Sequence, residues 1–178
     1  MRRRLLAGIL VAGVLLGCSS ADSGTADPTW EKFTPNFSLA GKTAEPVPVE
    51  SALPDGQYWG TLRVALGTDT IVFELMQARF GDTCEQWAAD NGMTEGCPND
   101  YWVDDSVSQI VSADDVPSVS VAEQSGPGTS YRIDGATLEK LARDEEVKVP
   151  DGYMWSNFPF IVALEGGRVV SADQFWVP

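Results

Sequence analysis

The sequence predicts an α+β domain: mainly an antiparallel β-sheet or small barrel, with two short helices and one disulfide. Three observations lead to this prediction. Apolar residues alternate at period two in several short segments, as in strands with one buried face. Two other segments carry the capping or stripe patterns of short helices. Besides Cys18, the chain contains one further pair of cysteines, Cys84 and Cys97.

Two antiparallel hairpins are predicted. Residues 58–66 and 71–75 each place alternate apolar residues on one face, and a Gly-Thr-Asp-Thr turn separates them. Residues 158–164 and 169–177 flank the sequence Glu-Gly-Gly-Arg, in which Gly-Gly suits a tight turn between paired strands. These hairpins are expected to form the main part of the sheet.

Three shorter strands are expected between the hairpins, at residues 101–104, 107–111 and 119–123. Pro117 places the third of them at a sheet edge or at a strand start, because proline has no N–H to donate to a neighbouring strand. Residues 125–130, which are rich in Ser and Gly, are expected to form a loop.

Two short helices are predicted. The first begins at an N-cap formed by Thr83, or by Asp82 one residue earlier, and ends at Gly92. Trp87 is expected to face the core from this helix. The second helix covers residues 134–144, where an apolar stripe at helical spacing faces the core.

Cys84 and Cys97 are expected to form a structural disulfide. Cys84 lies in the first turn of the first predicted helix, and Cys97 follows the end of that helix closely enough to reach back. A zinc site is not expected, because the chain contains no histidine. In the chain-entropy treatment, closing so short a loop stabilises the fold by about 3 kcal/mol.

The first eighteen residues predict a bacterial lipoprotein signal. Arginines at positions 2–4 precede an apolar run, which ends in Leu15-Leu16-Gly17-Cys18. The apolar stretch is too short for a membrane-spanning helix, which needs about 20 residues. Resemblance to lipoprotein signals implies cleavage before Cys18 and a lipid on its sulfur, which would hold the protein at the outer leaflet of the cell membrane.

The expected organisation has three parts: a signal peptide at residues 1–17, a lipid-anchored flexible tether at 18–54, and one globular β-rich domain at 55–178. The tether is rich in Ser, Ala, Gly and Asp, and prolines stiffen its end. It also contains three large aromatic residues, which either dock on the domain or contact the membrane or a partner: Trp30, Phe33 and Phe37.

The net charge of −14 excludes the basic surface that nucleic-acid binding requires. It also argues against a protein that lies flat on anionic lipid, so the acyl chains must provide the anchoring. A cationic partner is compatible with this charge, because opposite fields speed encounter. The alternative is a well-solvated acidic surface.

The sequence favours a protein that is not an enzyme. Without histidine there is no Ser-His-Asp or Cys-His site. Adjacent carboxylates do occur, but neighbours on a strand point to opposite faces, which is unsuited to glycoside hydrolysis. No cofactor and no metal are expected. Asp100, Asp104 and Asp105 form a weak calcium candidate, with turn formation as the alternative.

Aromatic residues are the candidate binding residues. Of the six tryptophans, three directly follow another aromatic residue and Trp155 lies two residues after Tyr153. On a strand, one member of each adjacent pair faces outward. Outward rings would form a recognition patch, since rigid aromatic side chains give large contact areas. The alternative is that a second layer buries them. The candidates are Trp59, Trp102, Trp155 and Trp176.

Two stretches of the domain resemble uncharacterised secreted proteins and lipoproteins of actinobacteria. One is Phe73-Glu74-Leu75-Met76-Gln77-Ala78-Arg79-Phe80-Gly81, followed by Asn99-Asp100-Tyr101-Trp102-Val103. The other runs from Phe158-Pro159-Phe160-Ile161-Val162 through Gly167-Arg168-Val169-Val170 to Asp173-Gln174-Phe175-Trp176-Val177-Pro178. This resemblance covers about residues 56–178 and brings no established activity.

The loop at residues 125–131 resembles the Ser/Gly-rich loop of lipoprotein lysozyme inhibitors, with an ordinary turn as the alternative. The leading hypothesis is therefore a lipid-anchored, non-enzymatic module of the cell envelope that binds a protein or glycan. One alternative is an inhibitor of a basic envelope hydrolase such as lysozyme. The other is a hydrolase that uses carboxylates.

Overall fold

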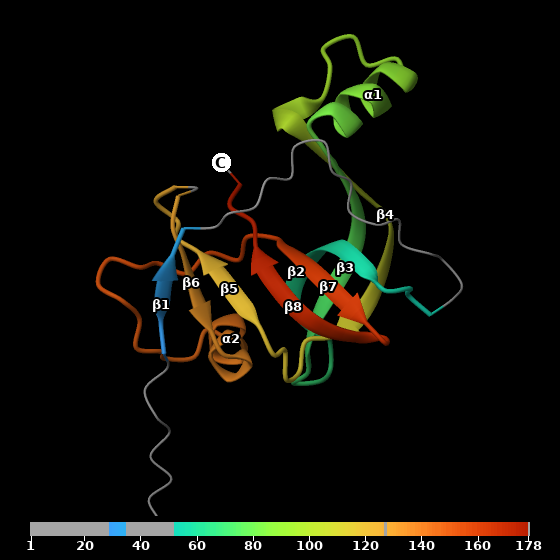
Figure 1. Cartoon of the computed structure of the whole chain (residues 1–178). Coiled ribbons are helices and arrows are strands. Elements are labelled where there is room, and N and C mark those ends of the chain that lie inside the picture. The colour runs from blue at the N-terminus through green and yellow to red at the C-terminus, as the bar shows by residue number, and fades with distance from the viewer. Residues whose placement is uncertain (1–28, 35–51, 127, 178) are drawn as a thin grey trace, which may run out of the picture.

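The computed structural model describes residues 29–34, 52–126 and 128–177. These residues form one eight-stranded sheet with two α-helices, which confirms the predicted α+β class (Figure 1). The strands are β1 (Glu31–Phe33), β2 (Gly56–Val64), β3 (Ile71–Phe80), β4 (Tyr101–Ser112), β5 (Val119–Ala122), β6 (Ser130–Ile133), β7 (Phe160–Glu165) and β8 (Arg168–Gln174). The helices are α1 (Asp82–Asp90) and α2 (Gly135–Ala142), and a 3-10 turn spans Pro98–Asp100.

The sheet consists of two antiparallel groups joined by one parallel pair. Its strand order is β1-β6-β5-β8-β7-β2-β3-β4, so β1 and β4 are its two ends and the sheet is not closed into a barrel. All neighbours pair antiparallel except β5 and β8. That parallel pair has only two Cα partners, Val119 with Ala172 and Ser120 with Asp173.

Side chains reinforce this short parallel pair, which we call the seam. The hydroxyl of Ser120 donates to Asp173 Oδ1 at 2.6 Å. The side chain of Gln174 is 1 % exposed, and its amide makes three hydrogen bonds to the backbone. Its Oε1 accepts from the N–H of Ala122 at 2.9 Å, and its Nε2 donates to the carbonyls of Ser156 and Phe158. The Gln174 amide therefore continues the strand pairing beyond the point where the β5–β8 backbones separate.

The main core lies inside the curved sheet, and α2 contributes to it. Leu138 and Leu141 of α2 pack into a cluster of residues from β2, β3, β5, β6, β7 and β8. At its centre the rings of Phe73 and Phe160 meet edge to face at 5.3 Å. Gly60 faces the same interior, where a Cβ atom would lie 2.8 Å from Val162 Cγ2. Glycine is required there because the neighbouring strands leave no space for a side chain.

Both predicted hairpins are confirmed, as β2–β3 and β7–β8. The second helix is also confirmed, with Asp134 as its N-cap, whose carboxylate accepts from the N–H of Thr137 at 2.7 Å. The predicted cap of the first helix is wrong. Gly81 occupies the N-cap of α1, and the Thr83 hydroxyl bonds instead to the backbone of Phe80.

The strands between the hairpins differ from the prediction in two ways. The two short strands expected at 101–104 and 107–111 are one strand, β4, interrupted by a register shift. Leu75 pairs with Gln109, and Gln77 pairs with Asp104. Between these two pairs β4 contains more residues than β3, so β4 bulges there. Strand β6 was not predicted, and Ser130, which was expected to end the preceding loop, is its first residue.

Part of the segment predicted as a tether pairs with the sheet. Glu31–Phe33 form β1 against β6. The ring of Trp30 contacts those of Tyr131 and Tyr153, and its Nε1 donates to the carbonyl of Lys148 at 2.9 Å. Trp30 thus docks on the domain, one of the two alternatives that the sequence left open. Phe37 and Cys18 lie outside the described residues.

We predict that Gln174→Leu lowers the free energy of unfolding by about 3 kcal/mol, because it leaves buried backbone groups of the seam unpaired. Chemical denaturation of the purified domain measures this. Gln57 is an exposed glutamine of β2, and Gln57→Leu is the matched control, with an expected change within about 0.5 kcal/mol. Equal stabilities of the two variants would show that the Gln174 amide does not hold the seam.

Candidate functional site

The four candidate tryptophans do not form one patch. Trp59 is 4 % exposed and packs in a second core cluster on the opposite face of the sheet from the main core. Trp155 is partly buried against the main core. Trp176 is partly buried after β8, where its Nε1 donates to the carbonyl of Gln124 at 3.2 Å. Only Trp102 belongs to a separate feature of the molecule.

That feature is a projecting hairpin, which we call the arm: residues 77–104, comprising the outer ends of β3 and β4 with α1 between them. Figure 1 shows α1 at the far end of β3 and β4, away from the other labelled helices and strands. The pairing of β3 with β4 continues to Phe80 and Tyr101, where the arm leads into α1 and the 3-10 turn. The arm is therefore an extension of the sheet and is continuous with its pairing.

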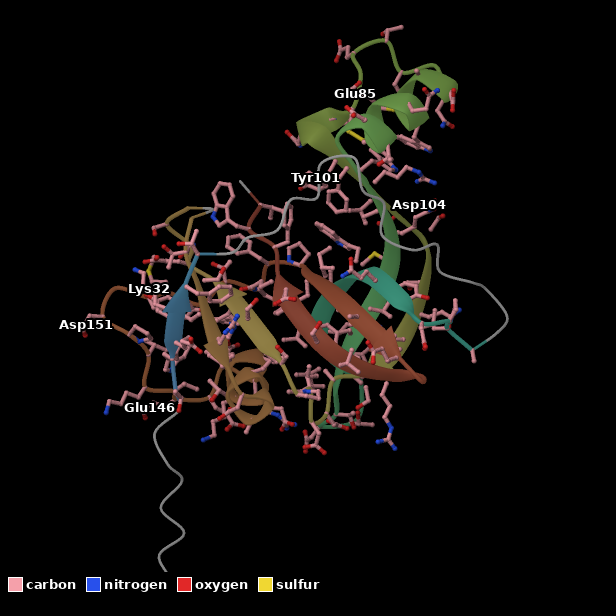
Figure 2. All side chains as sticks on the ribbon, viewed as in Figure 1. Lys32, Glu85, Tyr101, Asp104, Glu146 and Asp151 are labelled. Carbon is pink, nitrogen blue, oxygen red and sulfur yellow. A yellow bond between two sulfur atoms is a disulfide. The ribbon has the colours of Figure 1, made fainter. Side chains whose placement is uncertain are left out.

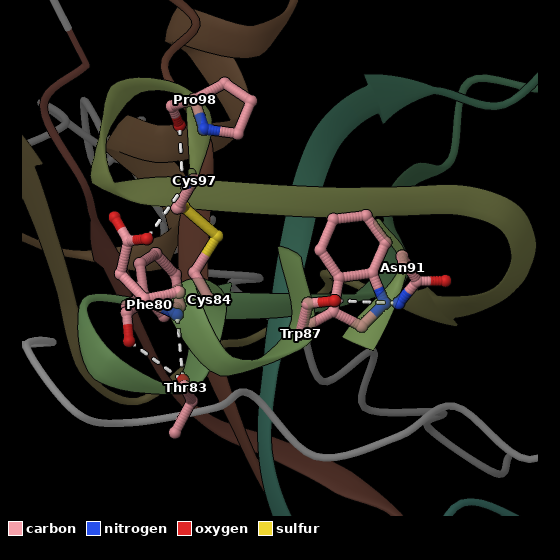
Figure 3. The surroundings of a disulfide bond; sticks show 8 residues. Phe80, Thr83, Cys84, Trp87, Asn91, Cys97 and Pro98 are labelled. Atoms are coloured by element: carbon pink, nitrogen blue, oxygen red, sulfur yellow. Dashed lines mark hydrogen bonds between the residues drawn. A yellow bond between two sulfur atoms is a disulfide. The ribbon is translucent and has the colours of Figure 1, made fainter. Parts of the chain in front are cut away.

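The tip of the arm is closed by the predicted disulfide. Cys84 in α1 is bonded to Cys97, with a Cα–Cα distance of 5.6 Å (Figure 3). The Glu85 carboxylate accepts from the N–H of Cys97 at 3.3 Å, which adds a second link across the same loop. At the other end of α1, the Asn91 side chain donates to the carbonyl of Trp87 at 2.8 Å. The disulfide and the Glu85 bond fix the helix to the segment that leads into β4, and the Asn91 bond caps the end of the helix.

The base of the arm is held by a cluster of four rings: Trp59, Phe80, Tyr101 and Phe175. Phe80 and Tyr101 come from the arm, Trp59 from β2, and Phe175 from the segment after β8. Trp59 stacks with Tyr101 at 5.7 Å and meets Phe175 edge-on at 5.9 Å. Phe80 contacts the other three rings. Burial of these rings fixes the arm to the body of the domain.

The opposite face of the arm carries a stack of partly exposed side chains. The rings of Trp87 and Trp102 stack with centroids 4.8 Å apart and an interplanar angle of 25°. The guanidinium of Arg79, the cross-strand partner of Trp102, lies 5.5 Å from the centroid of Trp87. The sequence predicted that Trp87 faces the core. Ala88 does so, whereas Trp87 is only partly buried against Trp102.

Asp104 extends this face. It lies two residues from Trp102 on β4 and opposite Gln77 on β3, so all three are on one side of the strand pair. The hydroxyl and the N–H of Ser106 both donate to its carboxylate, and with a smaller effect of Arg79 they lower the pKa of Asp104. Asp104 therefore stays charged at pH values where an ordinary aspartate begins to protonate. Figure 2 shows it on β4, below Glu85 of α1.

The weak calcium candidate is not assembled in the part of the chain that the structure describes. The side chain of Asp100 lies outside the described residues. Asp104 accepts hydrogen bonds from Ser106, and Asp105 is exposed. Across the described residues, no group of three or more His, Cys, Asp or Glu side chains is arranged to hold a metal ion.

The arm belongs to a long stretch of sequence without positive charge. From residue 80 to residue 131, the chain has no Lys, Arg or His. The same stretch contains ten acidic residues: Asp82, Glu85, Asp90, Glu95, Asp100, Asp104, Asp105, Asp114, Asp115 and Glu123. Arg79 is the only basic residue of the arm, and it lies against Trp87. The electrostatic field around the arm is therefore strongly negative.

A groove of about 740 Å³ lies at the other end of β4. It runs between the β4–β5 connection and the β7–β8 turn. Charged side chains on its rim are Asp114, Asp115, Glu165 and Arg168, all of them exposed to solvent. A groove with so open a rim does not provide the water-excluded site in which paired carboxylates become effective acids and bases.

Comparisons with protein-family models, with curated proteins and with solved structures found no match for this chain. Within the described residues, no helix is long and apolar enough to cross a membrane.

We predict that replacing both cysteines, as in Cys84→Ser with Cys97→Ser, lowers the free energy of unfolding by about 3 kcal/mol, because the unfolded chain loses its cross-link. Urea denaturation of the variant measures this, and wild-type protein in a reducing agent should give the same midpoint. If the oxidised wild type and the double variant unfold at the same urea concentration, the disulfide does not stabilise the domain.

Proposed function

We propose that the protein is a lipid-anchored, non-enzymatic binding module of the cell envelope, and that the arm is its contact surface. The observation that supports this is the construction of the arm: a disulfide fixes its tip, four rings fix its base, and stacked tryptophans on its outer face remain partly exposed. Rigid aromatic groups on a preformed projection lose little conformational entropy on binding.

The anchor rests on the sequence of residues 1–18. The arginines, the short apolar run and Cys18 together indicate export, cleavage and lipidation. A disulfide between Cys84 and Cys97 is consistent with an oxidising, extracytoplasmic location. In this proposal the lipid on Cys18 retains the protein at the outer leaflet of the cell membrane, and the domain faces outward with its arm available.

A second candidate function is inhibition of a basic envelope hydrolase such as lysozyme. The acidic stretch around the arm favours it, because a negative field speeds capture of a basic enzyme. An inhibitor also needs a rigid projection to occupy a cleft, and the arm has this form (Figure 1). Both candidates place the contact on the arm, so variants of the arm test both of them.

We predict that the immobilised chain without its signal peptide and lipidated cysteine, residues 19–178, retains an envelope protein or glycan, and that Trp102→Ala reduces the retained amount at least about tenfold. Trp176→Ala is the matched control, since Trp176 is a partly buried tryptophan of the body. Quantitative mass spectrometry and glycan analysis of the retained material measure both. Equal retention by the two variants, or none by the wild type, would contradict the proposal.

We predict that Cys18→Ala abolishes incorporation of radiolabelled palmitate in the native host, because it removes the sulfur that is proposed to carry the lipid. Fractionation should then show the loss of the mature lipoprotein from the membrane. Cys84→Ser with Cys97→Ser is the matched control, since these cysteines lie in the domain and should not affect labelling. Palmitate incorporation that persists without Cys18 would rule out this anchor.

A further inference from the structure

We propose that the outer face of the arm binds a positively charged protein surface, and that it seats an arginine of that partner between Trp102 and Asp104. This inference rests on the proposed function and adds the chemical class of the partner. It concerns the face formed by Gln77, Arg79, Trp87, Trp102 and Asp104.

Charge complementarity selects the class of partner. Arg79 supplies the only positive charge in the arm, and its guanidinium already lies over Trp87. Within the arm, α1 adds the acidic residues Asp82 and Glu85 in its first turn. An approaching anionic or neutral surface gains nothing from this field, whereas a basic surface is attracted and oriented by it.

The side chains of the face fit a guanidinium group in particular. An arginine binds best where a planar ring and a carboxylate are adjacent, because it stacks on the first and donates two hydrogen bonds to the second. Trp102 and Asp104 provide this pair on one face of β4. Contacts between a guanidinium and an aromatic ring already occur twice in the domain. The Arg79 guanidinium lies over the Trp87 ring, and the Arg132 guanidinium lies 4.8 Å from the centroid of the Phe33 ring.

The state of Asp104 suits this role. Its hydrogen bonds from Ser106 hold the carboxylate in one position, and they lower its pKa. Asp104 is thus charged and oriented before the partner arrives, which reduces the cost of ordering it on binding. Trp102 is likewise held by its stack with Trp87.

The inference is tested by calorimetric titration of the chain without its signal peptide and lipidated cysteine, residues 19–178, with lysozyme as a basic protein probe. Titrations with an arginine-only peptide and a lysine-only peptide of equal length follow. Two double variants separate local contact from overall charge: Asp104→Asn with Asp105→Asn, at the last residue of the arm and its neighbour, and Asp114→Asn with Asp115→Asn beside the groove. Both remove two negative charges, so they change the net charge equally.

We expect the arm variant and Trp102→Ala each to raise the Kd for lysozyme at least about tenfold, and the groove variant to raise it less than about threefold. The arginine peptide should bind more tightly than the lysine peptide, and Trp102→Ala should remove this difference. Added salt should weaken binding of every form.

Equal losses in the arm and groove variants would overturn the inference, because they would show that net charge alone matters. Absence of lysozyme and peptide binding would also overturn it. The proposed function would survive that result if the arm still retained a neutral or acidic envelope component in the capture experiment. If no component is retained there either, the proposed function fails as well.

Discussion

The fold depends on the parallel seam between β5 and β8. Two antiparallel groups, each built from local hairpins, meet there over only two pairs of residues. The Ser120–Asp173 bond and the buried Gln174 amide extend this contact. Through the seam, β5, β6 and α2 cover the core that β2, β3, β7 and β8 form. The same arrangement leaves β4 at the opposite end of the sheet, where β3 and β4 extend beyond the body as the arm.

The arm combines rigidity with accessibility. Its inner face contributes Phe80 and Tyr101 to the ring cluster at the base, so the arm is held by the body of the domain. Its outer face carries Trp87, Trp102 and Asp104, which are held by each other and by neighbours within β3 and β4 rather than by a covering layer. In the proposed lipid-anchored module, such a projection would carry the proposed contact surface away from the body.

Local patterns in the sequence were sufficient to predict the hairpins and α2. Gly-Gly at 166–167, the alternation along β2 and β3, and the apolar stripe of α2 are all patterns among neighbouring residues. The seam was not predictable, because it joins residues about fifty positions apart by only two backbone pairs. Alternation also does not tell which face of a strand is covered. Tyr58 and Trp59 point to opposite faces of β2, yet both are buried, because a second core cluster covers the face that carries Trp59.

Hydrogen exchange, read by mass spectrometry with and without lysozyme, shows directly whether the arm is the contact surface. We predict that lysozyme slows amide exchange within residues 77–104 and leaves the remaining strands and the groove unchanged. Slower exchange at the β4–β5 connection and the β7–β8 turn, with no change in the arm, would contradict it and would place the contact at the groove.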